Sequence, residues 1–454
     1  MPLLCLDVGS TWTKGALVSE AGELLGTAQH ATTAPEVLRG VDAVAAALEP
    51  GTAARAADLG SGAPGSSRTA AQAGGAVVPV LLCSSAGGGL RLAVVGQERL
   101  VSAEAGHRVA LSAGAKVVHV SDGELDGAGL RALRAASPDV VLLVGGTDGG
   151  DQRTLLHNAS RLAANRVRVP IILAGNTAAR AEALTRLAGR TVVVTDNVLP
   201  DIGELAPAPA RAAIREVFLR HVIGGKSLSR GPRFRRLVRA VTPDAVLSGV
   251  SLLASATDDT GAVLVVDVGG ATTDVYSAVS TVDETAGAVG LPTDRRTVEG
   301  DIGMRWSAPG VVAAATADRL IGEADGLAGA AAHRAAAVDW VPTTPEESTV
   351  DLRLAALAAR IALRRHIDAT GGRFGPRGIG LLILSGGPFR HAESVAEVET
   401  ALRSDPALRP HLRTAAVAVD TDYVLAPAGL LAAAGHRSAA ENLLTTRLRT
   451  THPH

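Results

Sequence analysis

The sequence predicts an α/β protein made of two related halves, and three observations support this class. Hydrophobic residues make up 47% of the 454 residues but aromatic residues only 2%, so the cores must consist of Val, Leu, Ile and Ala, as in parallel sheets covered by Ala-rich helices. Short apolar runs alternate with helical patterns from about 101 to 195. An Asp-Val-Gly motif ends two separate apolar runs. A chain of this length should form two or three domains.

The first 100 residues predict mainly strands. Turn-forming residues separate three apolar segments near the N-terminus, and a helical pattern follows. The expected strands are 3–8, 14–19, 24–29, 79–84 and 90–96, and the expected helix is 37–48. The Gly-, Ala-, Ser- and Pro-rich stretch 51–75 is interpreted as a surface loop or connector.

The next 100 residues predict a small, doubly wound parallel domain inserted into the first half. Each expected helix leads to a short apolar strand bounded by Gly, Pro or Asp, which is typical of β/α units. The helices are 103–113, 127–136, 152–165 and 177–187, and the strands are 116–120, 140–144, 171–174 and 191–194.

The rest of the chain repeats the strand–turn–strand pattern and then becomes helical. The basic run 230–239 is interpreted as a solvated helix face. Strands are expected within 263–279 and at 381–384, and helices at 208–222, 311–321, 328–337, 352–367 and 425–434. The expected domains are a first half over 1–100 to which 225–255 returns, an insert over 101–200, a connecting helical segment over 201–255, and a second half over 256–454.

The repeated motif predicts two phosphate-binding hairpins. Residues 4–14 (Leu-Cys-Leu-Asp-Val-Gly-Ser-Thr-Trp-Thr-Lys) parallel residues 264–274 (Leu-Val-Val-Asp-Val-Gly-Gly-Ala-Thr-Thr-Asp). Glycine permits a sharp turn whose amides can hold phosphate oxygens, and the hydroxyl groups add donors. Asp7 and Asp267, each at a strand end, are placed to hold Mg²⁺ through water. Two such hairpins would clamp one nucleotide from opposite sides.

A third motif predicts contact with adenosine. A buried strand at 381–384 leads into Ser385, Gly386, Gly387 and Pro388. A Gly-Gly pair after a strand lets a flat base and a ribose approach the backbone closely.

Two hairpins and one Gly-Gly turn, in this order, resemble the actin/Hsp70/sugar-kinase (ASKHA) superfamily. The resemblance implies duplicated actin-like ATPase halves of the ribonuclease H-like kind. It implies catalytic and metal-holding roles for Asp7 and Asp267, with ATP and Mg²⁺ as cofactors. The implied nucleotide-binding residues are Gly9, Ser10, Thr11, Thr13, Lys14, Gly269, Gly270, Ala271, Thr272, Thr273, Ser385, Gly386 and Gly387.

Four further stretches resemble the glutamate mutase L-component (MutL) family over nearly the whole chain. They are Ser-Ser-Ala-Gly-Gly-Gly-Leu-Arg at 84–91, Gly-Gly-Thr-Asp-Gly-Gly at 145–150, Ala-Gly-Asn at 174–176 and Thr-Val-Glu-Gly-Asp-Ile-Gly-Met-Arg at 297–305. The resemblance implies a slow, Mg²⁺-dependent ATPase that reactivates an adenosylcobalamin-dependent carbon-skeleton mutase by exchanging damaged cobalamin for intact cofactor.

Several alternatives stay open. A small-molecule kinase of the same superfamily would need an acidic base, for which Asp148 and Asp301 are candidates. A non-catalytic scaffold switched by nucleotide is the other alternative. Glu299 and Asp301 either position water or metal, or are turn residues.

The insert lacks an Asp-x-His-x-x-Gly loop, so we interpret it as a spacer or docking platform. The stretch Gly-Ser-Gly-Ala-Pro-Gly at 60–65 matches the spacing of a Rossmann loop, and Gly-Gly-Lys-Ser at 224–227 is similar to part of a P-loop. We reject both, because neither is expected to follow a strand.

Composition excludes other classes of function. A net charge of −1 and scarce aromatic residues argue against nucleic-acid binding. No apolar run reaches membrane-spanning length, and the first apolar stretch meets Asp7 at once, unlike a signal peptide. We therefore expect a cytoplasmic protein without a membrane partner. Cys5 and Cys83 lie in apolar runs and are expected to be buried.

Overall fold

The computed structural model describes residues 1–48, 78–85, 90–98, 115–202, 204–218, 233–257, 261–279, 293–322 and 325–448, together with 103, 105, 106, 109, 110 and 229. Residues 86–89 of the first family motif lie outside this part, as do the expected loop 51–75 with its 60–65 pattern, the 224–227 pattern and about half of the expected helix 103–113.

Two of the three sheets have the same topology. The first has the order β10-β4-β1-β2-β3 and the second the order β13-β12-β11-β14-β15. In each, the central strand (β1, Leu3–Val8; β11, Ala262–Val268) pairs antiparallel with the next strand and parallel with a later one. The other strands are β2 Trp12–Val18, β3 Leu24–Ala31, β4 Val80–Ser84, β10 Val238–Val241, β12 Thr273–Ala278, β13 Asp294–Glu299, β14 Ile379–Ser385 and β15 Ala416–Val419. The expected duplication of the strand–turn–strand unit is therefore confirmed.

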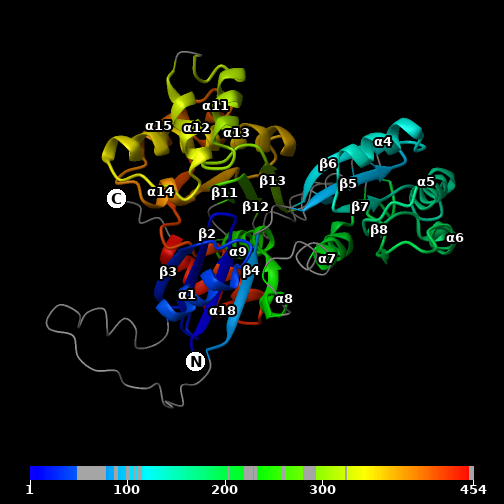
Figure 1. Cartoon of the computed structure of the whole chain (residues 1–454), viewed down its shortest axis with the longest axis horizontal. Coiled ribbons are helices and arrows are strands. Elements are labelled where there is room, and N and C mark those ends of the chain that lie inside the picture. The colour runs from blue at the N-terminus through cyan, green and yellow to red at the C-terminus, as the bar shows by residue number, and fades with distance from the viewer. Residues whose placement is uncertain are drawn as a thin grey trace.

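The two sheets share a core of helices that lies between them (Figure 1). Helices α9 (Thr242–Ala256), α17 (Leu425–Ala433) and α18 (Arg437–Leu448) pack against apolar side chains from both sheets, such as Cys5 and Val265. Gly249 and Gly429 allow α9 and α17 to touch, because a Cβ at either position would overlap a backbone oxygen of the other helix. Both cysteines are buried, as expected.

Helices cover the remaining faces of these sheets. Helix α1 (Leu38–Leu48) packs on β2 and β3, and α8 (Arg233–Leu237) precedes β10. A long helix, α13 (Pro345–Thr370), covers β11 and β12, and a Thr344–Glu347 capping box starts it. The other helices of this half are α11 Ala308–Ala317, α12 Leu327–Ala336, α14 Gly387–Arg390, α15 Ala396–Ser404 and α16 Arg409–Leu412.

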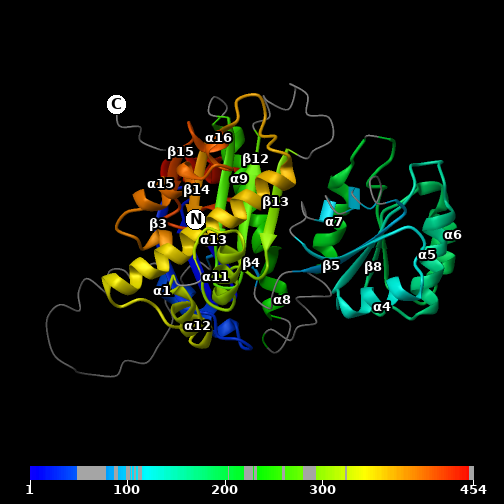
Figure 2. The same cartoon turned by 90° about the horizontal axis from the view of Figure 1, so that it is seen from above.

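The third sheet lies to one side of the other two in both views (Figures 1 and 2). Its order is β6-β5-β7-β8-β9, and all of its strand pairs are parallel. Its strands are β5 Arg91–Gly96, β6 Lys116–Asp122, β7 Val140–Leu143, β8 Ile171–Leu173 and β9 Val192–Val194. Its helices are α4 Gly127–Ala135, α5 Arg153–Ala164, α6 Arg180–Arg186 and α7 Pro207–Val217, with a 3₁₀ turn at Thr177–Ala179.

Two placements differ from expectation. Strand 91–96, expected in the first half, pairs with β6 and β7, so the third sheet begins at Arg91 and not after residue 100. The basic run contains a short helix and the start of β10, which pairs with β4 and buries Val238 and Val241. An apolar run shows that a strand exists but does not show which sheet it joins.

No helix in the described residues is both long and apolar enough to cross a membrane.

Candidate nucleotide site

The two repeated motifs form hairpins with the same register. Val8 pairs with Thr13 in the first hairpin, and Val268 pairs with Thr273 in the second, so four residues make each turn. The amide of Gly9 donates to the carbonyl of Trp12 at 3.0 Å, and that of Gly269 to Thr272 at 2.9 Å. The sequence repeat is therefore a repeat of backbone geometry.

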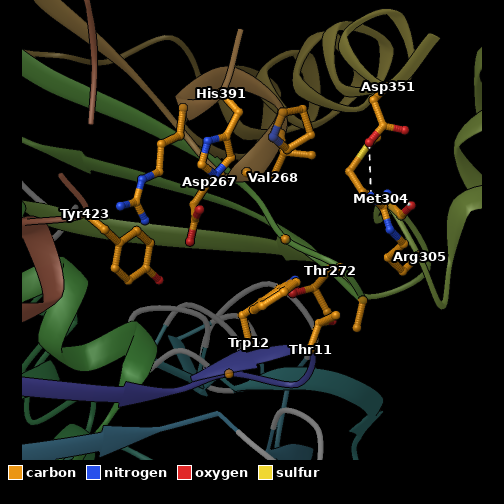
Figure 3. A pocket seen from close by; sticks show the side chains of 18 of the residues that line it. Thr11, Trp12, Asp267, Val268, Thr272, Met304, Arg305, Asp351, His391 and Tyr423 are labelled. Atoms are coloured by element: carbon orange, nitrogen blue, oxygen red, sulfur yellow. Dashed lines mark hydrogen bonds and ion pairs between the residues drawn. The ribbon is translucent and has the colours of Figure 1, made fainter. Parts of the chain in front are cut away.

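A cavity of ≈ 1410 Å³ lies between the hairpins (Figure 3). The start of α13, the turn after β14 and the start of α15 also line it. Twelve of the expected site residues line the cavity: Asp7, Gly9, Ser10, Thr11, Lys14, Asp267, Gly269, Gly270, Ala271, Thr272, Gly386 and Gly387. The structure thus brings together residues that are up to 380 positions apart in the chain.

Three expected site residues do not line the cavity. The Thr13 hydroxyl bonds to that of Thr32 at 3.1 Å, and the Thr273 hydroxyl donates to the carbonyl of Ile302 at 3.0 Å. Ser385 is buried. Each of the two threonines is the first residue after its turn that pairs with the preceding strand, and its side chain supports the hairpin from behind and is not open to a ligand.

Asp7 is buried and held by donors from three different elements. The Tyr423 hydroxyl donates to its Oδ2 at 3.0 Å, the Thr242 hydroxyl donates to its Oδ1, and the Cys83 thiol lies 3.5 Å from Oδ1. Together, β4, α9 and the segment after β15 fix the orientation of this carboxylate.

Asp267 occupies the equivalent position in the second half, in a different electrostatic setting. Burial raises the pKa of Asp267, the ammonium of Lys14 opposes this, and the carboxylates of Asp274 and Asp7 reinforce it. Asp267 lies directly opposite Asp274 across the hairpin, whereas Asp7 lies opposite Lys14. Arg296 compensates the like-charge pair through a 2.5 Å ion pair with Asp274.

The tips of the two hairpins touch. A Cβ on Gly270 would overlap the hydroxyl oxygen of Thr11, so only glycine permits this approach. That hydroxyl is buried and has no hydrogen-bond partner among the described residues. This unpartnered buried hydroxyl lies where the tips of the two hairpins meet.

The 297–305 motif braces the second hairpin from outside. The amides of Met304 and Arg305 donate to the carbonyls of Gly269 and Gly270 at 2.9 and 2.7 Å. The guanidinium of Arg305 then pairs with the buried Asp351 of α13 at 3.0 Å (Figure 3). Hydrogen bonds and a buried ion pair thus connect the hairpin to the helical layer above it.

The acids of this motif lie outside the cavity. Glu299 pairs with Arg365 of α13, and Asp301 is exposed. Neither residue lines the cavity. The turn interpretation therefore fits this segment better than a water- or metal-positioning role.

The turn after β14 needs its first glycine for geometry, whereas its second glycine borders open space. Gly386 has a φ of 119°, and a Cβ there would overlap the backbone oxygen of Val268. Among the described residues, no atom lies within 4 Å of the place that a Cβ on Gly387 would take, and Gly387 lines the cavity. His391 lies just beyond this turn and also lines the cavity (Figure 3).

Two further family motifs meet away from the cavity, at the carboxyl ends of β7 and β8. Asn176 accepts a hydrogen bond from the amide of Gly149 at 3.1 Å and donates to the carbonyl of Gly150 at 3.0 Å. Asn197 donates to Asp148 at 2.9 Å. The buried side chains of Asn176 and Asn197 fix the conformation of the glycine loop. Asp148 accepts a hydrogen bond there and does not line the cavity, so it does not fit the role of a kinase base.

Sequence reasoning missed Tyr423, Thr242 and Arg296, all of which line the cavity. Tyr423 and Thr242 contact Asp7 from 416 and 235 positions away, so no local sequence pattern predicts these contacts. Scarcity was the available signal: Tyr423 is one of only two tyrosines in the chain.

The fold and the site define an α/β protein in which two sheets of identical topology present paired glycine hairpins to one cavity. The family model described as "MutL protein" matches residues 3–448. Protein MutL of Clostridium tetanomorphum is 32% identical over 458 residues, which covers 94% of this chain and 95% of that protein. The chain belongs to the MutL family.

Two solved structures show distant similarity to this chain. The activator of the 2-hydroxyisocaproyl-CoA dehydratase from Clostridium difficile, with bound ADPNP, is 9% identical, with 99% of each chain covered and a TM-score of 0.31. A ROK family glucokinase from Streptomyces griseus, in complex with glucose and AMPPNP, is 13% identical, with 98% of this chain and 99% of that chain covered and a TM-score of 0.28. TM-scores this low support no conclusion about the function of this chain.

Proposed function

We propose that the cavity binds ATP with Mg²⁺ and that the protein is an ATP-hydrolysing accessory factor, acting in the cytoplasm, for an adenosylcobalamin-dependent carbon-skeleton mutase. The observation that supports this most strongly is the pair of hairpins with identical register, which present Asp7 and Asp267 to one cavity. Membership of the MutL family supports the choice of client.

The hairpins suit a polyphosphate. Backbone amides at Ser10, Thr11 and Gly270 lie at the turns, where successive N–H groups can surround an anion. The unpartnered hydroxyl of Thr11 would gain an acceptor in a phosphate oxygen. The turn at Gly386 and Gly387 would receive the adenosine.

The charges of the cavity suit a divalent cation. Asp7 and Asp267 face the cavity with Lys14 near both, so two carboxylates meet one ammonium. In the described part of the chain, no three His, Cys, Asp or Glu side chains converge to hold a metal by themselves. Mg²⁺ bound with nucleotide needs only one or two carboxylates, because phosphates and water complete its shell. Asp7 and Asp267 would hold it, and it would neutralise charge on the phosphates.

In hydrolysis, the chain's contribution is orientation and charge. The hairpin amides and Lys14 would stabilise negative charge that develops on the phosphate oxygens. Asp7 and Asp267 are the carboxylates that line the cavity beside the hairpins, so they would orient and polarise the attacking water.

We further propose that β5–β9 and their helices form an inserted, doubly wound domain that docks the client. All of its strand pairs are parallel, and apolar clusters cover both of its faces. It lies in the sequence between β4 and β10, so its ends join neighbouring strands of the first half.

Calorimetry with ATP tests the proposal. Wild type should bind ATP more tightly with Mg²⁺ than with EDTA, and Asp267→Ala should lose at least ~10-fold of affinity in Mg²⁺ because a metal-holding carboxylate is gone. Asp301→Ala is the matched control, since this aspartate lies in the same half but is exposed and outside the cavity. Wild type that binds no ATP in Mg²⁺ would refute the proposal.

Steady-state ATP turnover without any acceptor separates the reactivating factor from a small-molecule kinase. A pull-down with mutase subunits tests the client.

A further inference from the structure

One side chain of the second half reaches the charged residues of the first hairpin. Tyr423 lies four residues beyond the end of β15 and is 8% exposed. Its hydroxyl donates to Asp7 at 3.0 Å, although the two residues are 416 positions apart. Figure 3 shows its ring on the same side of the cavity as Asp267.

The same ring also carries Lys14. The ammonium of Lys14 lies 3.4 Å from the centre of the Tyr423 ring, which is the geometry of a cation–π interaction. Lys14 and Asp7 are directly paired across β1 and β2, so their side chains are neighbours on one face of the sheet. Tyr423 therefore contacts both charged residues of the first hairpin at once.

The backbone of Tyr423 is held in an unusual conformation for this purpose. Its φ is 56°, in the left-handed region that bulky residues rarely adopt. The segment is fixed nearby, because Asp420 accepts hydrogen bonds from the amides of Val424 and Leu425 at 2.8 and 3.4 Å. Outliers of this kind concentrate at functional sites.

We infer that Tyr423 is a positioning residue, which orients Asp7 and Lys14 toward a metal-bound phosphate; this rests on the proposed function. The Tyr423 hydroxyl holds Oδ2 of Asp7 while Thr242 and Cys83 contact Oδ1, so the orientation of the carboxylate is fixed from both oxygens. The Tyr423 ring holds the Lys14 ammonium 3.4 Å from its centre. Tyr423 comes from the segment between β15 and α17, and it lies in one apolar cluster with residues of the first sheet, so the packing of that segment sets the position of its ring.

Two substitutions separate the two contacts of Tyr423. Tyr423→Phe keeps the ring under Lys14 and deletes the donor to Asp7, whereas Tyr423→Leu deletes both. Tyr276→Phe is the comparison that removes the other tyrosine hydroxyl from the lining of the same cavity: Tyr276 lies on β12, and its ring faces the guanidinium of Arg296 at 5.8 Å.

The measurement is the ATP dissociation constant of each variant, by calorimetry, in EDTA and in Mg²⁺. Tyr423→Phe should match wild type in EDTA within about twofold but lose at least ~10-fold in Mg²⁺, the lower end of the range expected for a hydrogen bond to a charged group. Tyr423→Leu should bind weakly in both conditions, and Tyr276→Phe should keep the wild-type ratio between them.

The outcomes decide between the possible failures. If Tyr423→Phe keeps the full Mg²⁺ gain, or loses equally in EDTA and Mg²⁺, this inference is overturned while the proposed function stands. If wild type itself binds no ATP, both are overturned. Thermal melting without nucleotide accompanies each variant, and the Phe variant decides the matter if the Leu variant does not fold.

Discussion

A methyl group at Gly386 should damage the fold, whereas one at Gly387 should damage only binding. In Gly386→Ala the new Cβ overlaps the backbone oxygen of Val268 and lies 3.0 Å from its carbonyl carbon. Val268 is the last residue of β11, so a central strand must move before the methyl fits. The left-handed φ of 119° adds strain of about 1–3 kcal/mol. We expect the free energy of unfolding to fall by about 3–5 kcal/mol.

Gly387→Ala makes the same chemical change one residue later, with the opposite expectation for stability. Gly387 is the first residue of α14, and nothing lies within 4 Å of its Cβ position. The free energy of unfolding should stay within about 0.5 kcal/mol of wild type. The methyl projects beside the cavity where we propose that adenosine lies, so ATP affinity should fall by ~10-fold.

Urea unfolding, followed by tryptophan fluorescence, and ATP calorimetry measure the two effects on the same samples. Trp12, Trp306 and Trp340 all lie in the two halves and report on them. Unfolding of Gly386→Ala at the wild-type urea midpoint would refute the steric reasoning. Wild-type ATP affinity in Gly387→Ala would refute the adenosine contact and leave the steric reasoning intact.

Two further predictions concern the hairpin tips and the core. Gly270→Ala should weaken ATP binding because its Cβ overlaps the Thr11 hydroxyl, and adding Thr11→Ala should recover part of the loss; simple addition of the two losses in calorimetry would contradict this. Burial, aided by the charge of Arg295, lowers the pKa of His366 from 6.5 to about 3. The unfolded chain therefore binds this proton between those values and the folded one does not, so stability should fall as pH drops from 6.5 toward 3, by up to about 4–5 kcal/mol at 1.36 kcal/mol per pKa unit. His366→Gln should flatten that dependence, measured as urea midpoints at pH 4 and pH 7, and an unchanged slope would argue against it.

The parts of the site that the sequence predicts are those with local causes. A strand that ends in Asp-Val-Gly turns within four residues, and the same local rules apply at both repeats. The Gly-Gly turn likewise follows directly from its strand. Twelve of the expected site residues therefore line one cavity, since each was assigned from its own short motif.

Long-range packing decided the rest. Thr13 and Thr273 fit the hydroxyl pattern, yet each strand's alternation turns them behind the hairpin toward Thr32 and Ile302. Strand 91–96 joined the third sheet, a choice that depends on partners its own residues do not specify.

The sequence by itself determined the α/β class, the duplicated hairpins and the glycines at their turns, because these depend on residues that are neighbours in the chain. Only the tertiary structure decided that Tyr423 and Thr242 would hold Asp7, and that the Arg305–Asp351 pair would brace the second hairpin. Those contacts exist because the fold brings distant strand and helix ends to one cavity, and no spacing along the chain encodes which ends will meet.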